Sequence, residues 1–144
     1  MIIRDLKASD RAQWSPLWAA YLAFYETTLA PEITDATFAR LVDPSVPNLF
    51  GLVAEEAGAL LGFTHCVLHP ATWATTDHCY LEDLFTAPEA RGRGVGRALI
   101  EAVYARADEL NCARVYWHTH ETNTTARALY DKLARHAGFI HYRR

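Results

Sequence analysis

A glycine-rich turn in the second half of the chain is the group of residues with the most specific chemistry. It consists of Arg91, Gly92, Arg93, Gly94, Val95, Gly96 and Arg97. Because the turn follows an expected strand and precedes an expected helix, backbone N–H groups point outward at the positive end of a helix dipole. Such a site suits phosphate, and glycines let the backbone approach an anion closely. A helix start that uses its glycines only for tight turning is the alternative.

Two common phosphate-binding motifs do not fit this turn. A Walker A loop ends in Gly-Lys-Ser/Thr, which the chain lacks. A dinucleotide-binding fingerprint needs G-x-G-x-x-G in the first strand–helix unit, but counted from Gly94 the third glycine is replaced by Leu99. Both motifs are therefore excluded.

Two neighbouring carboxylates, Glu82 and Asp83, lie in the expected strand before the turn. Adjacent residues of a strand point to opposite faces, so only one of them can face a cleft on a given side. We expect Asp83 to cap a loop or to pair with an arginine. For Glu82, such a structural role and a role in the chemistry are evenly balanced.

The histidines and cysteines do not form a pattern typical of a metal site. His118 and His120 are two residues apart in an expected strand and share a face, but no third ligand is spaced to complete a site. We therefore expect no metal. The three cysteines are odd in number and lack C-x-x-C spacing, so we expect reduced thiols in a cytosolic protein.

Hydrophobic periodicity predicts the elements that position these residues. Strands are expected over residues 1–6, 49–55, 59–68, 79–86, 113–119 and 139–142. Helices are expected around 14–25 and over 34–42, 96–110 and 123–136, with Pro31 ending the first helical region. A hairpin comes early and helices alternate with strands late, so the predicted fold is α/β with a mixed sheet.

Length, charge and composition narrow the class of protein. With 144 residues, 51% hydrophobic and 22% charged, the chain is expected to form one domain over residues 1–144. A net charge of -3 argues against nucleic acid as a partner. Apolar runs stay far below the roughly 18 residues of a membrane helix, and the charged N-terminus is unlike a signal peptide. We expect a cytoplasmic protein without a membrane partner.

The motif Arg91-x-x-Gly94-x-Gly96, together with the strand of residues 80–86, resembles the acetyl-CoA signature of the GNAT N-acetyltransferases. The order of the elements is similar to that fold, so the resemblance covers essentially the whole chain. Residues 80–85 are similar to diamine and polyamine acetyltransferases, and residues 115–143 to the fungal histone- and D-amino-acid-acetylating subgroup. The resemblance implies a GNAT fold: a mixed, mostly antiparallel twisted sheet of about six to seven strands, with flanking helices and a splayed central cleft.

The resemblance also implies that acetyl-CoA is the co-substrate, with its pyrophosphate on the amides of the glycine turn. The pantetheine arm would pair with the backbone of Leu84 and Thr86 like an added strand, with Phe85 between them. Asn123 matches the position that usually contacts the cofactor arm.

Two residues match catalytic positions of the family. Tyr130 corresponds to the tyrosine thought to protonate the coenzyme A thiolate, with a core aromatic as the alternative. Glu82 corresponds to a carboxylate proposed to act as a base through water, or it could bind a cationic substrate directly. The acceptor side of the cleft is expected to be walled by Phe24, Tyr25 and Trp73, because the family places these segments there.

The resulting hypothesis is an N-acetyltransferase that moves acetyl from acetyl-CoA directly to a primary amine. The acceptor could be a small amine, a polyamine, an amino acid or a lysine side chain. A non-catalytic acyl-CoA-binding or sensing module on the same fold is the alternative. The resemblance further implies a homodimer, formed through the expected C-terminal strand 139–142, whose edge would otherwise be exposed.

Overall fold

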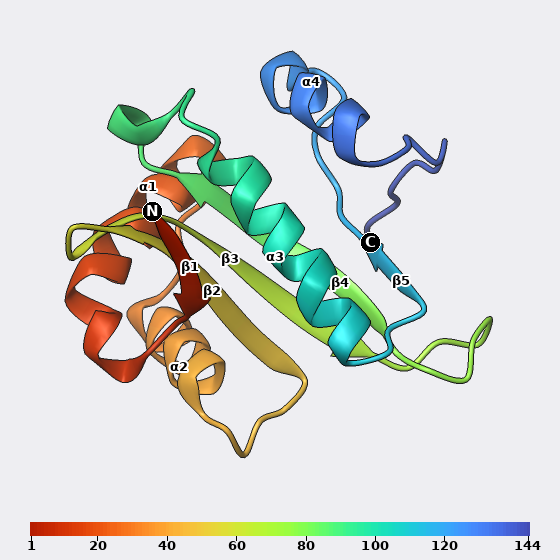
Figure 1. The fold of residues 1–144 in the computed structure, drawn as a ribbon, viewed down its shortest axis with the longest axis horizontal. Helices are drawn as coiled ribbons and strands as arrows, with labels where there is room; N and C mark the ends of the chain where they lie inside the picture. The colour runs from red at the N-terminus through yellow and green to blue at the C-terminus, as the bar shows by residue number, and fades with distance from the viewer.

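The computed structural model describes residues 1–144 and consists of one five-stranded sheet with helices on both faces (Figure 1). The elements in chain order are β1 Ile2–Asp5, the 3-10 turn η1 Ala8–Asp10, α1 Arg11–Phe24, α2 Pro31–Val42, β2 Leu49–Glu56, β3 Ala59–His69, β4 His78–Thr86, the 3-10 turn η2 Pro88–Ala90, α3 Val95–Glu109, β5 Arg114–Tyr116 and α4 Thr124–Leu133. None of the helices is both long enough and apolar enough to span a membrane.

The strands lie in the order β1-β2-β3-β4-β5. The first four strands pair antiparallel, whereas β5 pairs with β4 in parallel. This last pairing ends at Tyr80 and Tyr116, although β4 continues to Thr86. Beyond that point the chain after β5 turns away toward α4 (Figure 1), so the outer edge of β4 has no strand beside it. This is the splay that the resemblance implied.

Two hydrophobic cores cover the two faces of the sheet. Helix α3 packs on one face through residues at helical spacing, namely Val95, Leu99, Ile100, Val103 and Ala107. Helices α1 and α2 pack on the other face, where Trp14, Trp18 and Phe38 meet Phe63 and Phe85. The alternation of side chains along β2, β3 and β4 therefore decides which core each residue enters.

The sheet has five strands, fewer than the six to seven predicted. Residues 139–142 form no strand, and Phe139, Ile140 and Tyr142 are exposed. The strand predicted over 113–119 is reduced to Arg114–Tyr116, since β5 leaves β4 at the splay. Strand propensity alone does not create a strand, since the segment must also pair with a neighbouring backbone.

The helix boundaries also correct one prediction. Pro31 begins α2 at its first helical position instead of only ending the region before it. A proline suits that position, because its missing N–H would have no partner in the first turn. Helix α4 ends at Leu133, three residues before the predicted end, whereas α3 is shifted by only one residue.

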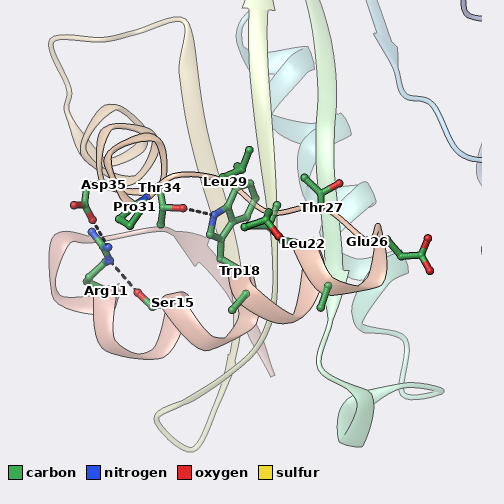
Figure 2. A pocket seen from close by; sticks show the side chains of 13 residues that line it. Arg11, Ser15, Trp18, Leu22, Glu26, Thr27, Leu29, Pro31, Thr34 and Asp35 are labelled. Atoms are coloured by element: carbon green, nitrogen blue, oxygen red, sulfur yellow. Dashed lines mark hydrogen bonds and ion pairs between the residues drawn. The ribbon is translucent and has the colours of Figure 1, made fainter.

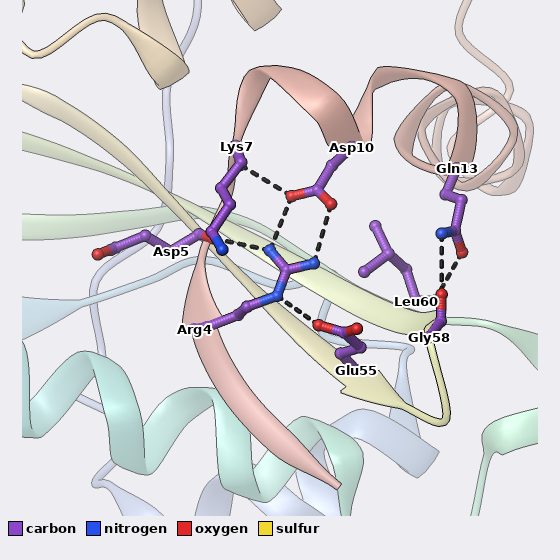
Figure 3. A network of polar contacts seen from close by, with 8 residues as sticks. All are labelled: Arg4, Asp5, Lys7, Asp10, Gln13, Glu55, Gly58 and Leu60. Atoms are coloured by element: carbon purple, nitrogen blue, oxygen red, sulfur yellow. Dashed lines mark hydrogen bonds and ion pairs between the residues drawn. The ribbon is translucent and has the colours of Figure 1, made fainter.

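A cluster of ion pairs fixes the N-terminal strand to its neighbours (Figure 3). The Arg4 guanidinium donates to both carboxylate oxygens of Asp10, at 2.8 and 2.9 Å, and to Glu55 on β2. Asp10 also accepts the Lys7 backbone N–H, at 2.8 Å. The bonds from Arg4 hold the pKa of the buried Asp10 carboxyl below its usual range. This cluster ties β1, η1 and β2 together beneath α1.

Candidate active site

The glycine turn lies between η2 and α3, at the end of β4. Gly94 is the N-cap of α3 with φ of 81°, and Gly92 has φ of 76°. These left-handed conformations favour glycine. A Cβ at either position would meet no atom within 4 Å, so the space in front of the turn is open. Gly94 as N-cap precedes the first N–H groups of α3, which have no partner within the helix and are available to an anion.

The three arginines of the turn lie at the rim of this space. The Arg91 Nε donates to the Thr86 carbonyl at 3.3 Å, and its guanidinium lies over the Phe85 ring. Arg93 pairs with Glu56 of the β2–β3 hairpin, and Arg97 with Glu101 one helical turn later. Two of the three arginines therefore already have acidic partners, which leaves Arg91 and the backbone amides as the groups of the turn available to an anion.

The predicted cofactor-arm residues lie on the part of β4 beyond the splay. The Leu84 side chain packs toward α3, whereas Phe85 is buried in the core beneath α1. Their backbone edge, together with that of Thr86, has no β5 neighbour. An extended ligand arm could add to this edge as a strand does, with the Thr86 carbonyl already partly engaged by Arg91.

A β-bulge in β4 decides where the two neighbouring carboxylates point. His65 of β3 pairs with Asp83, and the next residue, Cys66, pairs with Leu81, so Glu82 is the extra residue. Asp83 therefore points into the core beneath α1, and Glu82 is exposed at the bulge. Desolvation by neighbouring groups and the nearby Asp83 charge raise the pKa of the Glu82 carboxyl.

The prediction that Asp83 caps a loop or pairs with an arginine is wrong. Its carboxylate accepts the Tyr21 hydroxyl at 2.7 Å and contacts the His65 Nδ1 at 2.9 Å. On the far side of His65, the Trp14 indole N–H donates to Nε2 at 3.0 Å. No sequence signal could have grouped these residues, because Tyr21 and Asp83 are 62 positions apart.

Tyr130 projects from α4 with its ring edge-on to Trp117, at 5.5 Å between centroids. Its hydroxyl has no hydrogen bond to another protein group, and no buried side-chain polar atom is left unpaired, so this hydroxyl reaches open space. Burial of the ring, with Tyr25 nearby, raises the pKa of Tyr130 to about 12. The hydroxyl is therefore a protonated donor at neutral pH.

Two of the three predicted acceptor-wall residues lie together. Phe24 and Tyr25 line a cavity of about 360 Å³ with His120 and Asn123. The Tyr25 ring is 5.7 Å from the His120 ring, and the Asn123 side chain caps α4 by accepting the Ala126 N–H. Trp73 is not with them. It is 85% exposed in the loop before β4, at the opposite end of that strand from the glycine turn.

A larger, open cavity of about 660 Å³ lies between α1 and α2 (Figure 2). It contains none of the residues predicted for the site. The Trp18 indole N–H donates to the Thr34 hydroxyl at 3.1 Å, and Arg11 pairs with Asp35 at 2.6 Å. Glu26 is at the boundary of both cavities, so the end of α1 separates them.

Comparison with known proteins identifies relatives over the whole chain. The acetyltransferase (GNAT) family matches residues 9–134. The D-amino-acid N-acetyltransferase HPA3 of Saccharomyces cerevisiae is 39% identical, over 100% of this chain and 90% of that protein. The Bacillus subtilis N-acetyltransferase YhfO is 32% identical, over 99% of this chain and 95% of that protein. Among solved structures, AAC(6')-Iy in complex with a bisubstrate analog has a TM-score of 0.85 at 19% identity, over 99% of this chain and 96% of that one.

Proposed function

Because the chain belongs to the acetyltransferase (GNAT) family, we propose that it transfers the acetyl group of acetyl-CoA directly to a primary amine. The observation that carries this proposal is the arrangement around the splay. The amide-lined turn before α3 lies at the end of β4, the unpaired edge of β4 leads away from it, and a free Tyr130 hydroxyl projects from α4.

The residues of the turn and of β4 fit the co-substrate. The open space in front of Gly92 and Gly94 suits a pyrophosphate, and the free edge from Leu84 to Thr86 suits an extended pantetheine arm. Acetyl-CoA supplies, when bound, the thioester carbonyl that the amine attacks and the thiolate that leaves. Asn123, which already caps α4, would meet the arm from the other side of the splay.

Tyr130 acts as the general acid in this proposal. As the nitrogen–carbon bond forms and the carbon–sulfur bond breaks, its hydroxyl gives a proton to the leaving sulfur, and the amine nitrogen loses one to solvent or a base. Its raised pKa keeps the hydroxyl protonated until the thiolate develops. Glu82, whose pKa is also raised, is the carboxylate best exposed to receive the proton from the amine through water.

The acceptor amine would approach from the side of Phe24 and Tyr25. The yeast relative is named for D-amino acids, which makes amino acids the first acceptors to assay beside small amines, polyamines and peptide lysines. Exposed Trp73 is the least supported of the proposed wall residues.

The same experiment tests the enzyme against a non-catalytic acyl-CoA sensor. A panel of primary amines is assayed for release of free thiol from acetyl-CoA, and the products are checked by mass for a gain of one acetyl group. Amine-dependent thiol release supports the enzyme. Tight coenzyme A binding without turnover on any amine would favour the sensor.

The second copy of the chain is the partner we propose. Phe139, Ile140 and Tyr142 are exposed apolar residues at the end of the chain, and such residues are typical of surfaces that become covered. In this proposal the segment forms a strand only in the homodimer, where the other copy provides the missing edge.

A further inference from the structure

A series of four hydrogen-bonded side chains links α1, β3 and β4 behind the proposed acceptor wall of Phe24 and Tyr25. The Trp14 indole N–H donates to His65 Nε2 at 3.0 Å, His65 Nδ1 is 2.9 Å from one Asp83 oxygen, and the Tyr21 hydroxyl donates to the other at 2.7 Å. Trp14 is fully buried, and the side chains of His65 and Asp83 are only 3% and 14% exposed. These hydrogen bonds and the burial therefore hold the His65 and Asp83 side chains in place.

The indole fixes the form of the histidine. An indole nitrogen can only donate, so His65 Nε2 must be an acceptor without a proton. The single proton of the neutral ring then lies on Nδ1, which donates it to Asp83. The hydrogen bond from Trp14 therefore leaves His65 one N–H, which points to the carboxylate.

The two side chains bonded to the Asp83 carboxylate, Tyr21 and His65, are therefore both neutral donors. Burial, reinforced by the Asp83 carboxylate, raises the pKa of Tyr21 far above its usual range, so Tyr21 stays a neutral donor. The other titratable groups within the field of Asp83 are Tyr25, Cys66, Tyr80 and Glu82, and none of them is a cation. The nearby Arg40 acts on Glu82.

The Asp83 side chain is largely buried, and a buried charge without a counter-ion is costly, so such groups cluster at functional sites. Tyr21, which is bonded to Asp83, packs edge-on against Tyr25 at 5.1 Å between ring centroids, and Tyr25 lines the acceptor cavity. Burial and, after it, the Asp83 charge raise the pKa of Tyr25. The field of Asp83 therefore extends into the space where the acceptor of the proposed function would lie.

We propose that Asp83 attracts and holds the ammonium form of the acceptor amine, and that Trp14 and His65 are positioning residues that keep its charge uncompensated. This proposal rests on the proposed function for the identity of the ligand as an amine. It assigns the substrate class as amines that bind as cations. Glu82, exposed at the bulge, remains the group that accepts the proton.

The test measures binding without any reaction. Protein saturated with coenzyme A, which carries no acetyl group, is titrated with n-butylammonium chloride at pH 7 by calorimetry, and n-butanol serves as the uncharged probe. Asp83→Asn removes the charge but keeps the shape, because the Tyr21 hydroxyl can turn to accept the new amide. Glu89→Gln removes an exposed carboxylate on η2 and is the control for a change of one charge.

Two substitutions of His65 separate positioning from packing. His65→Gln can still accept from Trp14 and donate to Asp83 but never carries a charge, whereas His65→Met has a similar volume and no strong hydrogen bond. We expect Asp83→Asn to weaken n-butylammonium binding about tenfold or more, and His65→Met about fivefold, as loss of a hydrogen bond to a charged group implies. His65→Gln and Glu89→Gln should stay within about twofold of the original protein.

Each contrary result refutes one part of the proposal. The cation site is refuted if the original protein binds n-butylammonium no better than n-butanol, or if Asp83→Asn binds it equally well. Equal affinities of the His65→Gln and His65→Met proteins refute the positioning role. Should His65→Met not fold, Tyr21→Phe removes the other donor to Asp83 and must weaken binding instead. Failure of every amine in the thiol-release assay would contradict the proposed function but leave this binding result intact.

Discussion

Replacing Tyr130 with phenylalanine isolates the proposed proton donor from the packing of its ring. The edge-on contact with Trp117 is made by the ring and remains in Tyr130→Phe. The hydroxyl bonds no other protein group, so its loss should change the free energy of unfolding by less than about 0.5 kcal/mol. General acid catalysis contributes on the order of 10²–10⁴-fold, which corresponds to about 2.7–5.4 kcal/mol in the barrier. We expect kcat to fall within that range.

Tyr104→Phe provides the matched control on the neighbouring helix. The Tyr104 hydroxyl donates to the Leu133 carbonyl at 2.9 Å and so ties α3 to α4. Its loss should lower stability by about 1 kcal/mol and leave kcat nearly unchanged, the reverse of the Tyr130 pattern.

The assay measures thiol release with the best acceptor of the panel, beside thermal unfolding of all three proteins. Because the pKa of Tyr130 is about 12, the rate should also show no loss from Tyr130 ionisation between pH 6 and 10. If Tyr130→Phe keeps kcat within about threefold of the original protein, the general-acid role is refuted and Tyr130 is a packing residue.

Three further predictions concern the turn, the N-terminal ion pairs and the C-terminus. Gly94→Asp should weaken coenzyme A binding about tenfold or more in calorimetry. Gly58→Asp, at a similar positive φ in the β2–β3 hairpin, is the control and should not weaken it. Equal coenzyme A affinities of the two variants would contradict the anion site. Asp10→Asn should lower the free energy of unfolding at pH 7, as measured by urea denaturation, by about 2–3 kcal/mol. Since the folded pKa of Asp10 is below its unfolded value near 3.9, this difference should be fully present above about pH 4 and vanish as pH falls through the lowered pKa. Deleting residues 138–144 should convert the proposed dimer to a monomer in sedimentation, and a full chain that is already monomeric would contradict the dimer.

Local sequence was sufficient for most of the fold. The period of apolar residues in α3 and the glycines of the turn before it act within a few positions of one another, so their structure could be predicted from adjacent residues. The same holds for the hairpin of β2 and β3, whose turn residues are contiguous.

The length of the edge strands could not be predicted in this way. β5 ends after three residues because its pairing with β4 stops at the splay. Residues 139–142 form no strand because they pair with no other strand. Propensity in those segments describes what they could form, and the arrangement of the sheet decides what they do form.

The two carboxylates show most clearly what the sequence by itself determined. Alternation along a strand predicted that Glu82 and Asp83 point to opposite sides, but the bulge at Glu82 interrupts that alternation. Which of them points inward depended on the bulge at Glu82, and a shift of one residue exchanges the two faces. Only the tertiary structure brought Trp14, His65 and Tyr21 to Asp83, because a hydrogen bond depends on distance in space and these residues come from three separate elements.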